Sequence, residues 1–353
     1  MVSGQWSRCL VDAEVQPDHS FDVEVDAANS KSWLTLRLTQ RAMDGLLGRR
    51  LMMHSAGVSD QEGQVIALVG PSQMGKSTAA LALTQSEFGY VTDETVVLRR
   101  DGSVVPFPRP LGVHDPGQGV EVQLGPDELG LRSCPEALSL ARIVVLERDP
   151  EHDGPPTLTQ MPLIDGILAL VPHVSALARL VRPLQWLCRV VDECGGVFRL
   201  SYAEISETAP VLRRLLTETA ALDEQWSHVP MPDENRIGRG FRDGRVRQGY
   251  YTDAVAVGDE ALVLVGRTPV RLTGIGPTIW RAALGVPTRA EVLAQVVAEH
   301  GEHPDATGLV EGALESMLKA GVLGFARPLT LEEVRAGKAR PVPLPDDDNC
   351  GAY

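Results

Sequence analysis

The chain has 353 residues, enough for two or three domains with a sizeable hydrophobic core. Hydrophobic residues make up 43% and charged residues 23%, proportions that exclude a mainly disordered, collagen-like or coiled-coil protein. The net charge of -14 disfavours general binding to nucleic acid or anionic membranes, because their phosphates attract clustered Lys and Arg. We therefore expect a globular protein that binds neither.

The cysteines and the apolar segments indicate a cytoplasmic location. The five cysteines are an odd number, and none stands in a CxxC pair or at the Cys/His spacing of a zinc site. The first residues carry charges where a signal peptide needs an unbroken apolar core. The most apolar long stretch, residues 164–181, is interrupted by Asp165, Pro172 and Arg179, so it does not read as a membrane span.

Turn signals, charge and periodicity divide the chain into four parts. A stretch rich in Pro, Gly and Arg without apolar periodicity is typical of a linker, and a polar, acidic end is typical of a solvated tail. The expected parts are a first domain at 1–225, a linker at 226–249, a second domain at 250–326 and a tail at 327–353.

The first domain is expected to begin with a β-rich part, residues 1–50, with strands at 21–25 and 33–38. Further along, a helical stretch over 164–191 is broken by two prolines, which cannot continue a helix.

The second domain is expected to hold three strands followed by three helices. The runs AVAV and ALVLV around Gly258 and Asp259 predict a hairpin, and a third strand is expected at 270–272. The expected helices run from a Thr273 cap to about residue 284, from a Thr288 cap to about Gly301, and from Pro304 and Asp305 to Gly321.

The most specific motif matches G-x-x-x-x-G-K-[ST], between an apolar strand and a helix start. Backbone N–H groups of such a loop bind phosphate oxygens, and its glycines let the backbone approach closely. The pattern predicts that Lys76 reaches the phosphates of ATP and that Ser77 ligates Mg2+. The expected nucleotide-binding residues are Gly70, Pro71, Ser72, Gln73, Met74, Gly75, Lys76, Ser77 and Thr78.

Two adjacent carboxylates, Asp93 and Glu94, follow an apolar strand after this motif. A carboxylate at a strand end beside a phosphate loop can ligate the metal or accept a proton from an attacking hydroxyl. A simple turn between two strands is the alternative interpretation. The next turn, Asp101 and Gly102, predicts a hairpin, which departs from the strand–helix alternation of switch GTPases and motor ATPases.

Four motifs between residues 45 and 150 are a His-containing strand (LMMHSAGV, with His54), the phosphate loop, the acidic pair, and PFPRPL with Arg109. Together they resemble HPr kinase/phosphorylase-like kinases, which are related to PEP carboxykinases. The resemblance implies an α/β P-loop kinase domain with a mixed sheet, and a homo-oligomer. By position, it implies that Asp93 is the general base for the acceptor hydroxyl, His54 its neighbour, and Glu94 a metal-binding or orienting carboxylate.

One family signature is absent. The E-x-R-G-x-G-I segment of bacterial HPr kinases, with its Arg and metal-binding Glu, has no match here, and Arg109, Asp115 and Glu121 are the candidates to replace it. Glu147, at the end of an apolar strand, imitates a second acidic nucleotide motif, but a structural strand end is the favoured interpretation.

Residues 250–326, with LTGIGPTIW after the strands and MLKAGVL at the end, resemble PqqD-like domains, which bind leader peptides of ribosomally made natural products. The resemblance implies a winged-helix fold of three strands and three helices. A leader would pair along the sheet edge and place apolar side chains against the last helix. The expected contacts are Val270, Leu272, Leu314 and Leu318. DNA binding is disfavoured because acidic residues outnumber basic ones, while a structural or dimerisation role stays open.

These features lead to the hypothesis of an ATP- and Mg2+-dependent kinase fused to a peptide-recognition domain. It would phosphorylate a hydroxyl, Ser or Thr, on a precursor peptide held by its leader. Two alternatives stay open. One is a small-molecule kinase of natural-product biosynthesis with a structural C-terminal domain, and the other is a non-catalytic, nucleotide-gated scaffold that binds a peptide.

Overall fold

The computed structural model describes residues 5–9, 30–71, 75–115, 120–230 and 245–325. The chain divides into two compact units, with the division between Glu224 and Gln225 and a short piece, Val181–Gln185, grouped with the second unit. The strand expected at 21–25 and the tail expected at 327–353 lie outside the described residues. In the described part, no helix combines the length and the apolar character that a membrane span requires.

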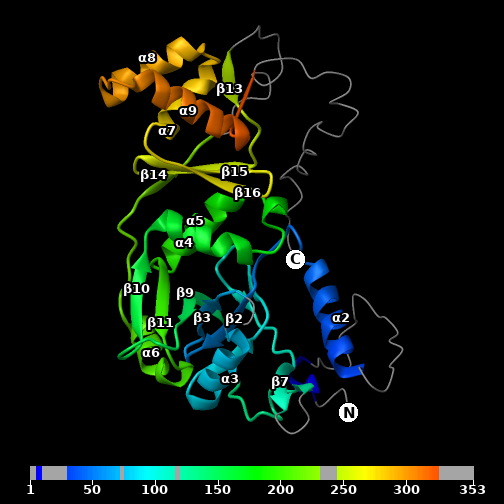
Figure 1. The fold of residues 1–353 in the computed structure, drawn as a ribbon. Helices are drawn as coiled ribbons and strands as arrows, with labels where there is room; N and C mark the ends of the chain where they lie inside the picture. Colours follow the sequence, from blue (N-terminus) through cyan, green and yellow to red (C-terminus); the bar gives the residue numbers. More distant parts are fainter. Residues whose placement is uncertain (1–4, 10–29, 72–74, 116–119, 231–244, 326–353) are drawn as a thin grey trace. The chain divides into compact units, whose positions relative to one another are not determined.

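The N-terminal unit is built on a six-stranded mixed sheet (Figure 1). Three neighbouring strands, β3 (Gln64–Val69), β9 (Ser139–Arg148) and β11 (Val197–Tyr202), are rich in apolar residues. Strand β9 pairs in parallel with both of the others, as expected for strands buried on both faces. The outer strands pair antiparallel. In spatial order the strands are β10 (Thr157–Met161), β11 (Val197–Tyr202), β9 (Ser139–Arg148), β3 (Gln64–Val69), β2 (Ser55–Ser59) and β4 (Gly89–Thr92).

Two smaller antiparallel ladders complete this unit. One has the order β1 (Leu51–Met53), β5 (Val96–Leu98) and β6 (Val104–Val105), and the other pairs β7 (Leu111–Asp115) with β8 (Val120–Leu124). The hairpin of β5 and β6 confirms the turn predicted at Asp101 and Gly102, where Gly102 has a φ of 79°.

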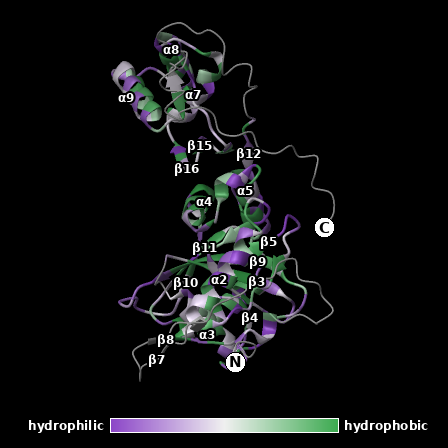
Figure 2. Ribbon diagram, turned by 90° about the vertical axis from the view of Figure 1, so that its right-hand side faces the viewer, coloured by the Kyte–Doolittle hydropathy of each residue, from purple (hydrophilic) through white to green (hydrophobic). Residues whose placement is uncertain are grey.

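Helices cover the large sheet. Helix α3 (Lys76–Ser86) and helix α6 (Ala209–Thr217) bury leucines and alanines in one cluster with side chains of β3, β9 and β11, and Figure 2 shows hydrophobic colour concentrated on these central strands. Helix α4 (Leu163–Leu170) approaches β11 so closely that a Cβ at Gly166 would lie 2.9 Å from Val197 Cγ2. Short 3-10 turns, η2 (Val171–His173) and η3 (Leu177–Arg179), separate α4 from α5 (Pro183–Glu193), which confirms the predicted breaks.

The strand predicted at 33–38 is wrong, because Ser30–Asp44 form helix α2. Trp33 and Leu36 are exposed, whereas Leu34, Thr35 and Thr39 are buried. The buried positions follow the spacing of a helix face rather than the alternation of a strand. The described part of residues 1–50 is therefore helical and not β-rich.

The C-terminal unit contains a four-stranded antiparallel sheet, one strand more than predicted, in the order β12 (Trp226–His228), β14 (Asp253–Val257), β15 (Glu260–Val265) and β16 (Thr268–Leu272). The hairpin around Gly258 and Asp259 is confirmed. Strand β13 (Val246–Gln248) pairs with β17 (Leu323–Phe325). Both ends of the expected linker, 226–249, thus belong to folded structure, because their strands find partners inside this unit; residues 231–244 lie outside the described part.

Three helices follow the sheet, as predicted: α7 (Gly276–Ala282), α8 (Arg289–His300) and α9 (Ala306–Lys319). Thr288 caps α8 in a reciprocal capping box with Glu291. Thr273 does not cap α7, whose N-cap position is Ile275. Trp280 sits at the centre of the core of this unit, with its ring centroid 5.2 Å from that of Tyr251.

Candidate active site

The loop between β3 and α3 holds the motif lysine. Gly75 has a φ of 83°, a left-handed conformation that favours glycine, at the point where α3 begins. The Lys76 ammonium donates to the carbonyl oxygens of Gly70 (2.8 Å) and Pro71 (3.1 Å). Burial lowers the pKa of Lys76, and the negative charge of Glu94 opposes that effect. The ammonium is therefore held inside the loop, near the acidic pair.

The structure describes only some of the other residues of the motif. Ser77 and Thr78 lie in the first turn of α3, where Thr78 is exposed. Ser72, Gln73 and Met74 lie outside the described residues, so their expected backbone contacts with phosphate stay predictions.

Asp93 is buried directly after β4, and its side chain is only 2% exposed. Ser77 Oγ donates to its Oδ2 atom at 3.3 Å. The Nε atom of Arg109 lies 2.9 Å from Oδ1, and the Tyr90 hydroxyl lies 3.2 Å from the same oxygen. Burial raises the pKa of Tyr90, and the neighbouring Asp93 charge adds to this effect, so the phenol stays a proton donor. Both oxygens of Asp93 are thus engaged by protein groups.

Glu94 is more open than its neighbour, with a side chain that is 28% exposed. Its Oε1 atom lies 3.3 Å from Nδ1 of His54, whose side chain is 38% exposed. The hydrogen bond with His54 lowers the pKa of Glu94 against the opposing effect of burial, and Arg109 lowers it further. Glu94 is therefore an ionised carboxylate paired with an accessible imidazole.

Arg109 joins the two carboxylates. Besides its bond to Asp93, its Nη1 atom lies 3.0 Å from Oε2 of Glu94. Burial alone would lower the pKa of Arg109, but the two carboxylates outweigh it and raise the value. The guanidinium also donates to Thr39 Oγ1 of α2 at 3.4 Å. A permanent cation thus lies between two adjacent carboxylates and offsets part of their charge.

The residues present fit a nucleotide and Mg2+. An ammonium has three donors, so Lys76 keeps capacity for a phosphate oxygen beyond its two carbonyl bonds. The Ser77 hydroxyl and the Asp93 carboxylate offer adjacent oxygen ligands, the type that Mg2+ prefers. Within the described residues, no three His, Cys, Asp or Glu side chains gather as a self-sufficient metal site. This donor set suits a metal shared with substrate phosphates.

The structure brings five expected residues together, His54, Lys76, Asp93, Glu94 and Arg109, and Ser77 joins them through its hydrogen bond to Asp93. The remaining candidates are placed elsewhere or only in part. Glu147 accepts from Ser201 Oγ at 2.7 Å at a strand end, a structural role. Asp115 and Glu121 lie on β7 and β8, but their side chains are outside the described part.

Sequence reasoning missed three neighbours of the site: Tyr90, Thr39 and His173. Tyr90 reads as an ordinary strand residue, although its position three residues before Asp93 was a usable signal. Thr39 and His173 come from segments distant in sequence, so nothing local marks them.

Two of the expected peptide contacts prove to be core residues. Leu272 is 4% exposed and Leu314 is fully buried, both within the core of the C-terminal unit. Their side chains therefore pack the unit rather than face a ligand, which corrects that expectation. Val270 and Leu318 are half-buried, and β16 is an edge strand.

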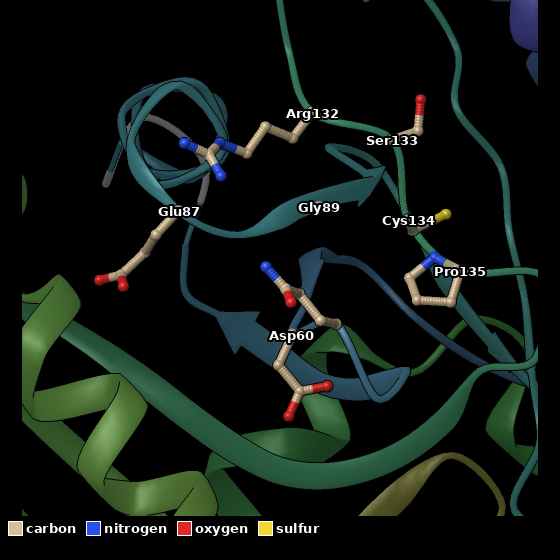
Figure 3. Close-up of a pocket in the computed structure, with 8 residues that line it drawn as sticks. Asp60, Glu87, Gly89, Arg132, Ser133, Cys134 and Pro135 are labelled. Carbon is tan, nitrogen blue, oxygen red and sulfur yellow. The ribbon is translucent and has the colours of Figure 1, made fainter.

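A separate pocket of about 380 Å³ lies at the beginning of β4, at the opposite end of that strand from Asp93. Figure 3 shows side chains from three segments around it, including Asp60, Glu87 and Arg132. Burial raises the pKa of the Cys134 thiol in its wall. None of the five clustered site residues lines this pocket.

Comparison with known proteins gives a limited result. No protein-family model matches the chain, and no curated protein matches it. Among solved structures, the chain is similar to the HPr(Ser) kinase/phosphatase from Coxiella burnetii, with a TM-score of 0.28 and 14% sequence identity. The match covers 48% of this chain and 99% of that chain.

Proposed function

We propose that this protein is an ATP- and Mg2+-dependent phosphotransferase that phosphorylates a hydroxyl group. The observation that carries the proposal is the arrangement of Lys76, Ser77 and Asp93, with 3.3 Å between the serine hydroxyl and the carboxylate. This arrangement offers a cation for phosphates beside oxygen ligands for their metal. A Mg2+ ion bound there would neutralise charge on the phosphates.

In the proposed reaction, the acceptor oxygen forms a bond to the γ-phosphorus as the bond to the β–γ bridging oxygen breaks. ADP leaves with the electron pair, and the hydroxyl proton passes to the protein. Lys76 orients the phosphates, and Arg109 holds the two carboxylates in position.

Within this proposal, Glu94 accepts the proton and Asp93 positions the metal, which reverses the roles implied by the family resemblance. The support is exposure, because the Glu94 side chain is 28% exposed and that of Asp93 is 2% exposed. His54 orients Glu94 and can share the proton.

A pair of amide variants tests this assignment. Glu94→Gln should lower kcat by about 10²–10⁴-fold, the usual contribution of a general base, with little change in the Mg2+ concentration required. Asp93→Asn should raise the Mg2+ requirement. A large loss of kcat in Asp93→Asn, with a raised Mg2+ requirement in Glu94→Gln, would instead identify Asp93 as the base.

We further propose that the acceptor is a precursor peptide whose leader pairs with edge strand β16. Pro269 has no N–H, and proline in a sheet is tolerated where its nitrogen faces away from the partner strand, here β15. In an antiparallel strand, Arg271, two residues on, then presents its N–H to the same edge. Val270 and Leu318 add half-buried apolar surface.

Matched variants separate the backbone contribution from the side chain. Arg271→Pro removes the backbone N–H together with the side chain, whereas Arg271→Ala removes the side chain alone, with its ion pair to Glu260 (2.6 Å). With labelled peptides encoded by short reading frames beside the gene, anisotropy should show binding to the wild type and the Ala variant and lost binding to the Pro variant. Equal binding to all three would contradict strand addition.

The acceptor itself is tested by intact-mass spectrometry of the same peptides after incubation with protein, ATP and Mg2+. A gain of about 80 Da, abolished by Lys76→Ala, is the expected result. ATP consumption without peptide modification would favour the small-molecule kinase, and ATP binding without consumption would favour the scaffold.

A further inference from the structure

We propose that His173 contacts the terminal phosphate of the bound nucleotide, an inference that rests on the proposed function. His173 ends the 3-10 turn η2, far in sequence from the phosphate loop and the acidic pair. Three backbone features and the charges around its ring support this assignment.

The first support is strand-like pairing beside β1. The backbone N–H of His54 donates to the carbonyl oxygen of His173 at 2.7 Å, and that of Ser175 donates to the carbonyl oxygen of Met52 at 2.9 Å. Between them, Met53 and Val174 form an antiparallel bridge. The segment around His173 therefore runs along the edge of β1, next to the site.

This register makes His173 and His54 directly opposite residues. Met53 faces Val174, and the two segments run antiparallel. His54, the residue after Met53, therefore faces His173, the residue before Val174. The Nδ1 atom of His54 pairs with Glu94, so the backbone of His173 lies beside the residue that carries this pair.

The second support is the charge around the His173 ring. Burial lowers the pKa of His173, and the positive charges of Lys76 and His54 lower it further. The half-buried imidazole thus stands within electrostatic reach of the motif lysine, with Glu94 as the nearby negative partner of both Lys76 and His54. An imidazole N–H beside the Lys76 ammonium suits a multiply charged phosphate, because both can donate to its oxygens.

Lys76 is expected to hold the β and γ phosphates, and Glu94, the proposed base paired with His54, must lie at the γ end. A group near Lys76 and His54 therefore meets the γ end rather than the sugar end. His173 would donate a ring N–H to a γ-phosphate oxygen and stabilise charge during transfer. A nucleotide that lacks the γ-phosphate would not engage it.

NMR of histidine-labelled protein tests this directly, with the His173 signal assigned by its loss in His173→Gln. The Mg2+ complex of the imidodiphosphate analogue of ATP should raise the pKa of His173 by about 1 to 2, as expected for a phosphate charge near an imidazole. Mg2+ and ADP should leave it nearly unchanged. Equal responses to the two nucleotides, or none despite bound analogue, would overturn the proposal while leaving the proposed function intact.

Calorimetry supplies a second readout that does not depend on turnover. His173→Gln should weaken analogue binding about tenfold, the effect of losing one charge-assisted hydrogen bond, with ADP binding and thermal stability unchanged. His152→Gln, at a half-buried histidine whose Nε2 atom lies 3.2 Å from the Pro155 carbonyl oxygen, is the matched control and should change neither. Weaker binding of both nucleotides to His173→Gln would indicate that His173 has a merely structural role. If neither nucleotide bound to the wild type, the proposed function would be overturned as well.

Discussion

Replacing Arg109 with Met should destabilise the N-terminal unit strongly. Methionine keeps the apolar stem but removes the charge that lies between Asp93 and Glu94. Asp93 would then be a carboxylate with 2% side-chain exposure and no cation at hydrogen-bond distance. Leaving a buried charge unpaired is costly, because neither water nor an opposite charge solvates it.

The surroundings set the size of the effect. Breaking a buried ion pair costs about 3–5 kcal/mol. Asp93 keeps bonds from Tyr90 and Ser77, and Glu94 is partly solvated, so we expect the lower end of that range, about 3 kcal/mol. This corresponds to more than about a 100-fold rise in the population of the unfolded unit.

Native-state hydrogen exchange of β3 and β9 reports on this unit alone. Their amides should exchange more than about 100-fold faster in Arg109→Met. Arg148→Met removes an exposed ion pair with Glu204 and should cost under about 1 kcal/mol. Adding Asp93→Asn to Arg109→Met should recover much of the loss, since a neutral amide needs no cation. Similar exchange in the two Arg variants would refute the reasoning.

Three further predictions follow from the geometry. Gly166→Ala should cost about 1–3 kcal/mol by thermal unfolding, because its Cβ would meet Val197 at 2.9 Å. Gly75→Ala should lower the free energy of unfolding by about 1–2 kcal/mol, because a φ of 83° is unfavourable for alanine. Crowding is not the cause, since the nearest atom, Thr78 Cβ, lies 3.9 Å from the new Cβ; an unchanged Tm would contradict this prediction. Because the pKa of Glu94 is lowered from its ordinary 4.5, its ionised form adds stability that is fully present above 4.5 and is lost as the pH falls through the folded-state value. Glu94→Gln should therefore flatten the loss of unfolding free energy measured in that acid range.

The phosphate loop could be predicted because its determinants are local. Gly75 is needed for a left-handed φ at the start of α3, and the apolar run of β3 precedes it directly. The same holds for the Thr288 capping box and the hairpin at Gly258, where residues within a few positions decide the backbone.

The rest depended on contacts between distant segments. Part of helix α2 was predicted as a strand from its apolar residues. Two of these, Trp33 and Leu36, are exposed, so the apolar residues do not mark the buried face of the helix. Burial of Leu272 and Leu314 follows from how β16 and α9 pack, which no local pattern reveals. The bridging role of Arg109 was not visible in the sequence either, because it needs three segments to meet.

Binding of Mg·ATP, measured by calorimetry on the wild type and on Lys76→Ala, tests the central claim most directly. The account predicts saturable, Mg2+-dependent binding to the wild type and a large loss of affinity in the variant, because the Lys76 ammonium is held inside the loop beside Ser77 and Asp93. Unchanged affinity in Lys76→Ala, or no binding to the wild type, would contradict it.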